Sequence, residues 1–186
     1  VICSDKTGTL TEGKPKLVSI ISSEAFNDID NLYHAASLER ASEHPLAEAI
    51  VNGAEERDIH LSSTKNFKSI TGKGVSGTID GKNVLLGNLK LLQNNNIDAG
   101  PLPEKADKLR AEGQTVMLLA IGGKAAGLIG VPDPIKQTTP NAIKDLHDEG
   151  VEVVMLNGDN HTAAQALTYK LDFESGRDDD YQIEKD

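Results

Sequence analysis

Hydrophobic and polar positions follow two different patterns along the chain, and each pattern predicts its own kind of structure. Short apolar runs at residues 1–3 and 152–156 have the length and composition of buried parallel strands. Helices are expected after the second run and from Thr139 to Gly150, where Ala142, Ile143 and Leu146 share one face. This order of strands and helices predicts a doubly wound parallel sheet of the α/β class.

The middle of the chain predicts a different architecture. Strands are expected at residues 14–22, 67–71, 75–79, 83–86, 115–121 and 124–131, and helices at residues 29–42, 45–57 and 104–112. Pro45 would be the first residue of its helix, a position that tolerates proline. Asp80-Gly81 between two strands is typical of a hairpin turn. Together these elements predict an antiparallel sheet with flanking helices, an α+β arrangement.

We therefore expect one domain to interrupt another. Residues 14–131 are predicted to form the α+β domain, and residues 1–13 and 132–186 a split α/β domain in which the first strand pairs with the strand at 152–156. Pro132-Asp133-Pro134 ends the last strand of the middle block and predicts a hinge. Because the chain begins within a strand, without an initiator Met or a signal peptide, we expect it to belong to a longer protein.

Composition and charge exclude several classes of protein. With 38% hydrophobic and 26% charged residues, the chain of 186 residues has the balance of a soluble globular protein. Its longest apolar run falls well short of the roughly 18 to 20 residues that a membrane helix needs. A formal net charge of −10 disfavours a nucleic-acid partner. Cys3 is the single cysteine, so no internal disulfide can form, and we expect a buried thiol.

The residues after the first strand carry the strongest chemical signal. They run from Asp5 to Thr11 with the sequence DKTGTLT. Open α/β sheets bind ligands at the carboxyl ends of their strands, where the Asp5 carboxylate can attack a phosphoryl group and form an aspartyl-phosphate. Lys6 can offset charge repulsion, and Thr7 together with the backbone amides of the turn can hold phosphate oxygens.

A second carboxylate is expected at the same edge of the sheet. Asp159 follows the strand predicted at residues 152–156, so it can converge with Asp5 on one site. Two carboxylates facing a phosphate repel it unless a cation intervenes, and the pair therefore predicts Mg²⁺. The Asp5 carboxylate and the Thr7 backbone carbonyl are the candidate metal ligands.

Two features of the middle block predict contacts with a nucleotide. His44 precedes Pro45 at the start of a helix, where the imidazole can stack on or hydrogen-bond an adenine. Gly72 and Gly74 lie between two strands, where glycines let the backbone approach a base or ribose closely. The spacing Gly72, Gly74, Gly77 also fits a dinucleotide fingerprint, but hairpin strands follow instead of a helix, which disfavours a Rossmann site.

These strings together resemble the heavy-metal-transporting P-type ATPases. DKTGTLT is similar to the phosphorylation motif of that family, SEHPLAEAI and TGKGVSG to its first two nucleotide-binding elements, and Gly87-Asn88 to the third. The resemblance implies a haloacid dehalogenase-like phosphorylation domain interrupted by a nucleotide-binding domain. It also implies that Glu39, in the helix before SEHPL, contacts adenine.

Two further segments resemble motifs of the same family. Asp133-Pro134-Ile135-Lys136 is similar to its hinge, which makes Asp133 a candidate nucleotide contact and lets Lys136 reach the phosphate site. Asn157-Gly158-Asp159 resembles its Thr-Gly-Asp motif, with the Asn157 amide in place of the usual phosphoryl-binding threonine. The family's later Gly-Asp-Gly-x-Asn-Asp segment is absent, so the phosphorylation domain is expected to be incomplete at its carboxyl end.

The resemblance implies a function and a setting. ATP would bind in the middle domain and, with Mg²⁺, phosphorylate Asp5. The partners would be the transmembrane and actuator domains of the same transporter, at the cytoplasmic face of a membrane, and these residues would not bind the transported metal. Within this resemblance, the SEHPL motif favours copper over zinc, cadmium or lead as the transported metal.

Two other functions stay open. A stand-alone phosphohydrolase of the same superfamily would need a second acid two positions after Asp5, where Thr7 stands. A non-catalytic nucleotide-binding module is the other alternative, because the later motif is missing and Asn157 replaces the usual threonine.

Overall fold

A computed structural model gives the fold, and it describes residues 2–5, 9–12, 16, 19–132, 135–151 and 153–156. The chain divides into two compact units. Unit 1 comprises Val1–Pro15, Arg110–Thr115 and Asp133–Asp186, and unit 2 comprises Lys16–Leu109 and Val116–Pro132. Each unit is built from its own sheet.

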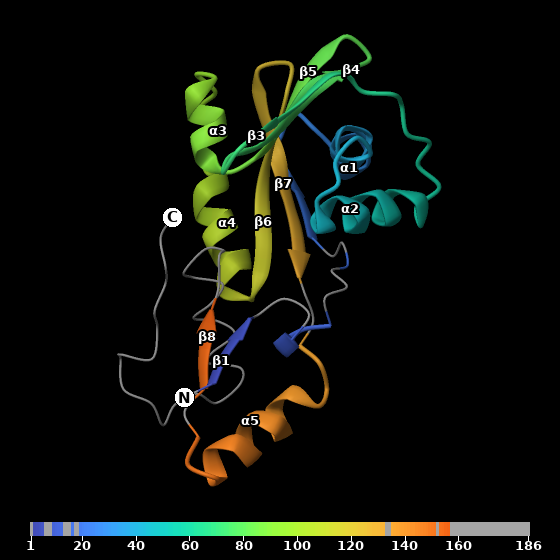
Figure 1. Cartoon of the computed structure of the whole chain (residues 1–186). Helices are drawn as coiled ribbons and strands as arrows, with labels where there is room; N and C mark the ends of the chain where they lie inside the picture. The colour runs from blue at the N-terminus through green and yellow to red at the C-terminus, as the bar shows by residue number, and fades with distance from the viewer. Residues whose placement is uncertain are drawn as a thin grey trace. The chain divides into compact units, whose positions relative to one another are not determined.

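A six-stranded sheet of order β2-β7-β6-β5-β4-β3 forms the centre of unit 2 (Figure 1). The strands are β2 (Ser19–Ser22), β3 (Lys65–Ile70), β4 (Gly74–Ile79), β5 (Lys82–Gly87), β6 (Gln114–Ile121) and β7 (Lys124–Pro132). Antiparallel pairing joins β2 to β7, β3 to β4, β4 to β5 and β5 to β6. The predicted hairpin at Asp80-Gly81 is confirmed, with both residues in the left-handed backbone region that such turns require.

Helices cover both faces of this sheet (Figure 1). α1 (Asp28–Glu39) and α2 (Pro45–Glu55) share one hydrophobic core with the sheet, and α3 (Leu89–Asn94) and α4 (Leu102–Ala111) share the other. Neighbouring residues of one strand enter opposite cores, as Leu118 and Leu119 do in β6, because side chains alternate along a strand. The α+β architecture predicted for the middle block is therefore confirmed.

Capping residues set the ends of these helices. Asn27 accepts a hydrogen bond from the Asp30 amide at 2.8 Å and starts α1. The helix predicted to reach residue 42 ends at Glu39, where the Ala41 and Ser42 amides donate three residues back, to the Leu38 and Glu39 carbonyls, in place of four. The sequence interpretation missed α3, a helix of one and a half turns that begins at the Asn88 cap.

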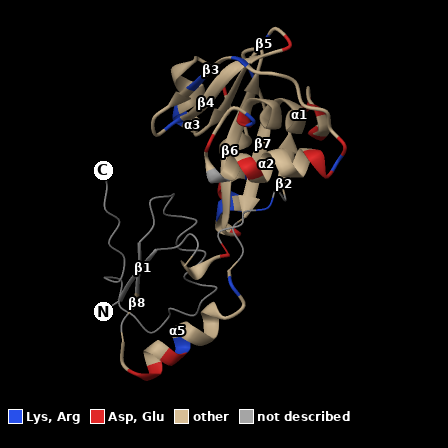
Figure 2. Ribbon diagram, turned by 45° about the vertical axis from the view of Figure 1, so that its right-hand side comes forward, with Lys and Arg blue, Asp and Glu red and all other residues tan. Residues whose placement is uncertain are grey.

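The edge strand β3 is protected against pairing with other chains. Lys65 and Lys68 are exposed on it, and the pairing register with β4 shifts between them. Figure 2 shows basic residues in blue on this strand. Asn66, within the shift, has a positive φ of 52°. Charged side chains and a bulge on an edge strand discourage edge-to-edge association.

Unit 1 contains a parallel pair of strands. β1 (Ile2–Asp5) pairs with β8 (Val153–Leu156), and Asp5 lies opposite Leu156. This confirms the predicted pairing of the first strand with the strand before Asn157. The predicted helix is present as α5 (Thr139–Asp148), while the helix expected to follow Asn160 and end at about Leu171 lies outside the described residues.

A small core joins the described parts of unit 1. Leu10, Ile143 and Val153 are buried together, and the Thr139 hydroxyl donates to the Leu10 carbonyl at 2.8 Å. Thr11 and Ile135 form a single antiparallel bridge. These contacts fasten the segment after β1 to the segment that enters α5. In the described part of the chain, no helix combines the length and the apolar character that crossing a bilayer requires.

Candidate functional site

Glu39 lies on the buried face of α1. Leu32, Ala35 and Ala36 precede it at helical spacing, and each is 0% exposed. Glu39 is only 5% exposed, and its Oε2 has no hydrogen-bond partner among the described residues. A carboxylate thus occupies a position where the pattern of the helix would place an apolar residue.

Burial gives this carboxylate unusual properties. Desolvation raises the pKa of Glu39 above its ordinary value, and a hydrogen bond from the Ser42 side chain opposes that rise. An unsatisfied buried polar atom typically costs about 1–3 kcal/mol. The free protein therefore holds a buried acceptor whose capacity for a hydrogen bond is not met by any described residue.

We expect a Glu39→Gln variant to lose a pH-dependent part of the folding free energy. Because the folded-state pKa of Glu39 is raised, the protonated carboxyl stabilises the fold at low pH, and this stabilisation is lost as pH rises through the raised pKa. The free energy of unfolding of the wild type, minus that of Glu39→Gln, should fall by on the order of 1 kcal/mol as pH rises.

Urea denaturation at a series of pH values, from below 4.5 to neutrality, measures this difference. Glu43→Gln is the matched control, because Glu43 is exposed in the same loop. A difference between wild type and Glu39→Gln that stays constant with pH would contradict the expectation.

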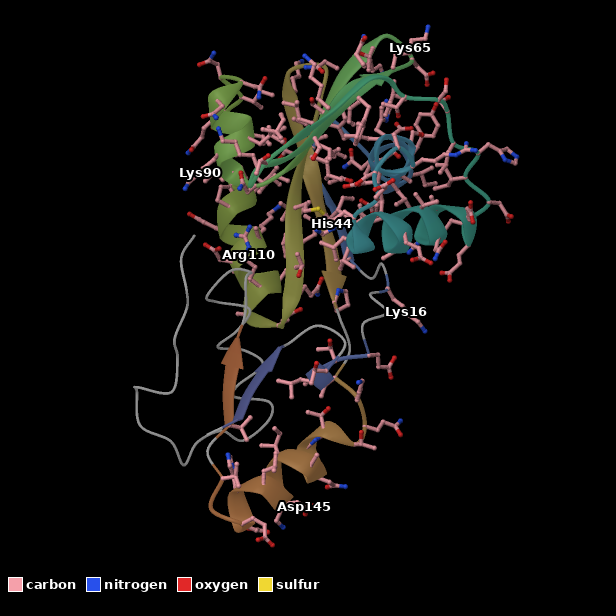
Figure 3. The ribbon with its side chains drawn as sticks, viewed as in Figure 1. Lys16, His44, Lys65, Lys90, Arg110 and Asp145 are labelled. Carbon is pink, nitrogen blue, oxygen red and sulfur yellow. The ribbon has the colours of Figure 1, made fainter. Side chains whose placement is uncertain are left out.

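Ser42 connects His44 to Glu39 by hydrogen bonds. The Ser42 side chain hydrogen-bonds Glu39, and its Oγ accepts from the His44 amide at 3.3 Å. The His44 Nδ1 accepts from the Leu46 amide at 3.2 Å and so caps α2 (Figure 3). The neutral ring therefore carries its proton on Nε2. Since no described residue hydrogen-bonds Nε2, this N–H is available to a ligand.

The glycine turn before β4 packs directly against the end of β5. Gly74 and Gly87 are register partners, and a Cβ on Gly87 would lie 2.0 Å from the Lys73 carbonyl oxygen. A Cβ on Gly74 would lie 2.2 Å from the Leu86 carbonyl oxygen, and the φ of Gly74 is +137°. Gly72 has a φ of +66°, with open space where a side chain would begin. Close backbone approach, together with positive φ, explains why these positions hold glycine.

Asn88 holds this turn in place. Its Nδ2 donates to the Gly72 carbonyl at 2.8 Å, and its backbone amide donates to the Lys73 carbonyl at 2.8 Å. Its Oδ1 accepts from the Leu91 amide at 3.1 Å and caps α3. The structure therefore brings together Gly72, Gly74, Gly87 and Asn88, four predicted site residues from separate parts of the sequence.

Both groups of predicted nucleotide contacts border β4. The glycine turn starts this strand, and Leu38, which directly precedes Glu39, packs against Gly77 three residues further along it. Sequence reasoning did not single out Ser42, although it is the first residue of the SEHPL string. Its hydroxyl is the group that connects the Glu39 carboxylate to the cap at His44.

In unit 1, Asp5 is the last residue of β1. The Lys136 backbone lies close in the fold to the chain that follows Asp5, because its amide donates to the Leu10 carbonyl at 3.2 Å. The other predicted residues of this site lie outside the described residues: Lys6, Thr7, Asp133, Asn157, Gly158 and Asp159. Among the residues that the structure describes, no three His, Cys, Asp or Glu side chains are grouped so as to hold a metal ion.

Comparison with known proteins now identifies the family. The family model described as haloacid dehalogenase-like hydrolase matches residues 1–185. The chain belongs to this family. The fold class predicted from the sequence, a haloacid dehalogenase-like domain interrupted by an α+β block, is thereby confirmed.

Individual proteins that resemble the chain give a narrower comparison. A copper-exporting P-type ATPase from Legionella pneumophila is 49% identical over 167 residues, which cover 90% of this chain and 23% of the relative. A zinc-transporting PIB-type ATPase of known structure is 30% identical with a TM-score of 0.71, covering 92% of this chain and 28% of that one.

A second solved structure describes the catalytic domain of the CPx-ATPase CopB-B upon nucleotide binding. It is 25% identical with a TM-score of 0.66, covering 92% of this chain and 59% of that one. The resemblance to heavy-metal P-type ATPases that the motifs predicted is thus confirmed. The chain spans about a fifth of the length of the curated relatives that it matches.

Proposed function

We propose that the chain is the ATP-binding and phosphorylated part of a P-type ATPase that transports copper. One observation carries the nucleotide-binding half of this proposal. The buried Glu39 carboxylate has an unpartnered oxygen, and His44, joined to it through Ser42, presents an unpartnered Nε2–H. The Glu39 carboxylate at the end of α1 is therefore a hydrogen-bond acceptor, and the His44 ring at the start of α2 is a donor.

Adenine is the base that complements this pair. Its exocyclic amino group donates hydrogen bonds, and its neighbouring ring nitrogens accept them. Guanine presents the acceptor O6 in place of that amino group, and a carboxylate would repel it. ATP binding also fits the glycine turn, whose bare backbone leaves room for the ribose or phosphates beside Gly72.

The phosphorylation half of the proposal rests on Asp5. An oxygen of its carboxylate would attack the γ-phosphorus of ATP, the bond from that phosphorus to the bridging oxygen would break, and ADP would leave. Asp159 follows three residues after Leu156, the register partner of Asp5, which supports its place in the same site. Lys6 and Lys136 would offset negative charge, and Asp133, Asn157 and Gly158 would contact the nucleotide or phosphoryl group.

Mg²⁺ fits the donors of this site. The Asp5 carboxylate and the Thr7 carbonyl are oxygen donors of the kind that Mg²⁺ prefers. Bound there, the ion would neutralise the charge between phosphate and carboxylates.

The rest of the transporter would supply the partners. The chain spans about a fifth of the length of its curated relatives. We therefore propose that the same polypeptide also contains the transmembrane and actuator domains of the transporter. This part would lie at the cytoplasmic face of the membrane and would not itself bind the transported ion. The printed name of the Legionella relative supports copper as that ion.

Calorimetric titration with ATP and GTP tests nucleotide binding. Wild type should prefer ATP, and Glu39→Gln should bind ATP about tenfold more weakly, because a hydrogen bond to a charged acceptor is replaced by one to a neutral acceptor. Since the same substitution removes an unfavourable buried charge, unfolding cannot account for the loss of affinity.

Glu43→Gln should leave the ATP affinity unchanged. Equal affinities of wild type and Glu39→Gln, or equal affinities of wild type for ATP and GTP, would remove the basis for the adenine assignment.

A further inference from the structure

The last turn of α1 is held by a segment that lies far from it in the sequence. We call residues 62–64, the three residues before β3, the strap. Thr64 Oγ1 donates to the Ser37 carbonyl at 2.6 Å, and the Ser62 amide donates to the Ser37 hydroxyl at 3.2 Å. One turn earlier, the Tyr33 hydroxyl hydrogen-bonds the Ser62 hydroxyl at 2.6 Å. The strap thus follows one side of α1 toward its carboxyl end.

The bond from Thr64 completes the carboxyl end of this helix. The final four carbonyls of a helix have no intrahelical partner and need donors from elsewhere. In α1 the local backbone supplies three of the four donors: Arg40 to Ala36 at 2.9 Å, Ala41 to Leu38 at 3.3 Å and Ser42 to Glu39 at 2.8 Å. The Ser37 carbonyl receives its hydrogen bond from Thr64 instead.

Thr64 also fills the space between α1 and β4. A Cβ on Gly77 would lie 2.5 Å from the Thr64 Cγ2 and 2.9 Å from the Leu38 Cδ1. Leu38 is 0% exposed and belongs to the hydrophobic core, where side chains are closely packed. The absence of a side chain at Gly77 lets Thr64 and Leu38 sit against the strand at their present depth.

Glu39 is the next residue after this fixed pair. Ser37 is held by the strap, Leu38 is packed on Gly77, and the Glu39 carboxylate emerges from the same turn. Among the described residues, the Ser42 side chain, just beyond the same turn, hydrogen-bonds this buried carboxylate, and its Oε2 has no hydrogen-bond partner. Its position therefore depends on the turn that carries it.

We propose that Thr64 is a positioning residue for base recognition, which holds the last turn of α1 so that the Glu39 carboxylate meets the amino group of adenine. This proposal rests on the ATP-binding function proposed above. Thr64 acts through its hydroxyl, which donates to the Ser37 carbonyl, while its methyl group fills space beside Gly77.

Two substitutions separate the hydroxyl of Thr64 from its methyl group. Thr64→Val keeps the shape and loses the donor, and Thr64→Ser keeps the donor and loses the methyl group. In calorimetric titrations of the whole chain, Thr64→Val should weaken ATP binding about five- to tenfold, the loss that corresponds to one hydrogen bond. Thr64→Ser should stay within about twofold of wild type. Ser63→Ala, in the same strap but with an exposed side chain, is the control.

The ratio of ATP to GTP affinity distinguishes positioning from general stability. A loosened fold would lower the affinities for ATP and GTP by the same factor. A displaced Glu39 carboxylate should instead lower the affinity for ATP more than that for GTP, and so lower the ratio of the two affinities. Thr64→Val with the wild-type ratio would overturn the proposal. If Glu39→Gln also leaves ATP affinity unchanged, the nucleotide assignment itself has failed; if Glu39→Gln weakens ATP and Thr64→Val does not, only the role of Thr64 has failed.

A second pair of variants tests the contact at Gly77 and does not depend on the folding of Thr64→Val. Gly77→Ala should lower the ATP to GTP ratio, because the new methyl group collides with the Thr64 Cγ2 and the Leu38 Cδ1. Adding Thr64→Ser to Gly77→Ala removes the collision with the Thr64 Cγ2 and should partly restore the ratio of ATP to GTP affinity. A double-mutant cycle measures this coupling between the two positions. Additive effects of the two substitutions would contradict the proposed coupling.

Discussion

Replacing Asp5 by asparagine is expected to abolish the acid-stable phosphoenzyme formed from labelled ATP and Mg²⁺. The neutral amide of the variant would lack the charged oxygen that attacks phosphorus, so the label on the protein should fall to background. Sensitivity to hydroxylamine should mark the wild-type label as an acyl phosphate. The experiment uses a longer protein that includes the Gly-Asp-Gly-x-Asn-Asp segment of the family, since the resemblance implies that this segment supplies a further metal ligand.

Asp145→Asn is the matched control for this experiment, because Asp145 is an exposed carboxylate of the same unit, on α5 (Figure 3). It should leave the label intact. Label that persists in Asp5→Asn would rule out Asp5 as the nucleophile. ATP binding without any phosphoenzyme in the wild type would favour a non-catalytic nucleotide-binding module, and turnover without accumulated label would favour a phosphohydrolase.

Gly87→Ala is expected to cause the largest loss of stability in unit 2, about 3 kcal/mol, the upper part of the usual range for overpacking. The added methyl group would lie 2.0 Å from the Lys73 carbonyl oxygen and 2.9 Å from the Gly74 Cα, and both contacts are with backbone. Backbone atoms cannot rotate away, so β5 and the glycine turn must separate. ATP affinity should fall with the displacement of the turn.

Gly123→Ala is the matched control for Gly87→Ala. Gly123 has a φ of +79° but no atom within 4 Å of an added Cβ, so the substitution there strains the backbone without a collision. We expect a smaller loss of stability, about 1 kcal/mol, with unchanged ATP affinity. Chemical denaturation and calorimetry of both variants measure the contrast. A Gly87→Ala protein as stable as the wild type would refute the close approach of the two backbones.

The sequence predicted the elements of the fold well where the pattern was long and regular. β6 and β7 were predicted to within a residue, because apolar runs bounded by Gly122-Gly123 leave few alternatives. α3 was missed because its six residues, 89–94, are too short to show a period. The signal that could have found it is Asn88, a strong N-cap residue followed by Leu89, Leu91 and Leu92.

The site was predicted unevenly, for a physical reason. Asp5 could be placed at a strand end from the local pattern alone. Glu39 came only from family resemblance, although its helical spacing from Leu32, Ala35 and Ala36 puts a carboxylate on an apolar face and marks it as unusual. The bond from Thr64 to Ser37 spans 27 residues, and no local pattern indicates a contact of that range. The role of Asn157 stays a prediction.

The pairing of β2 with β7 brings the two ends of unit 2 together. These are its first and last strands, and at their outer ends the Lys16 amide donates to the Pro132 carbonyl at 3.3 Å. Residues 16 and 132, the first and last residues of unit 2, are therefore neighbours, although residues 110–115 between them belong to unit 1. By the same geometry, an engineer could exchange residues 16–132 for another nucleotide-binding unit whose two ends meet at a similar distance.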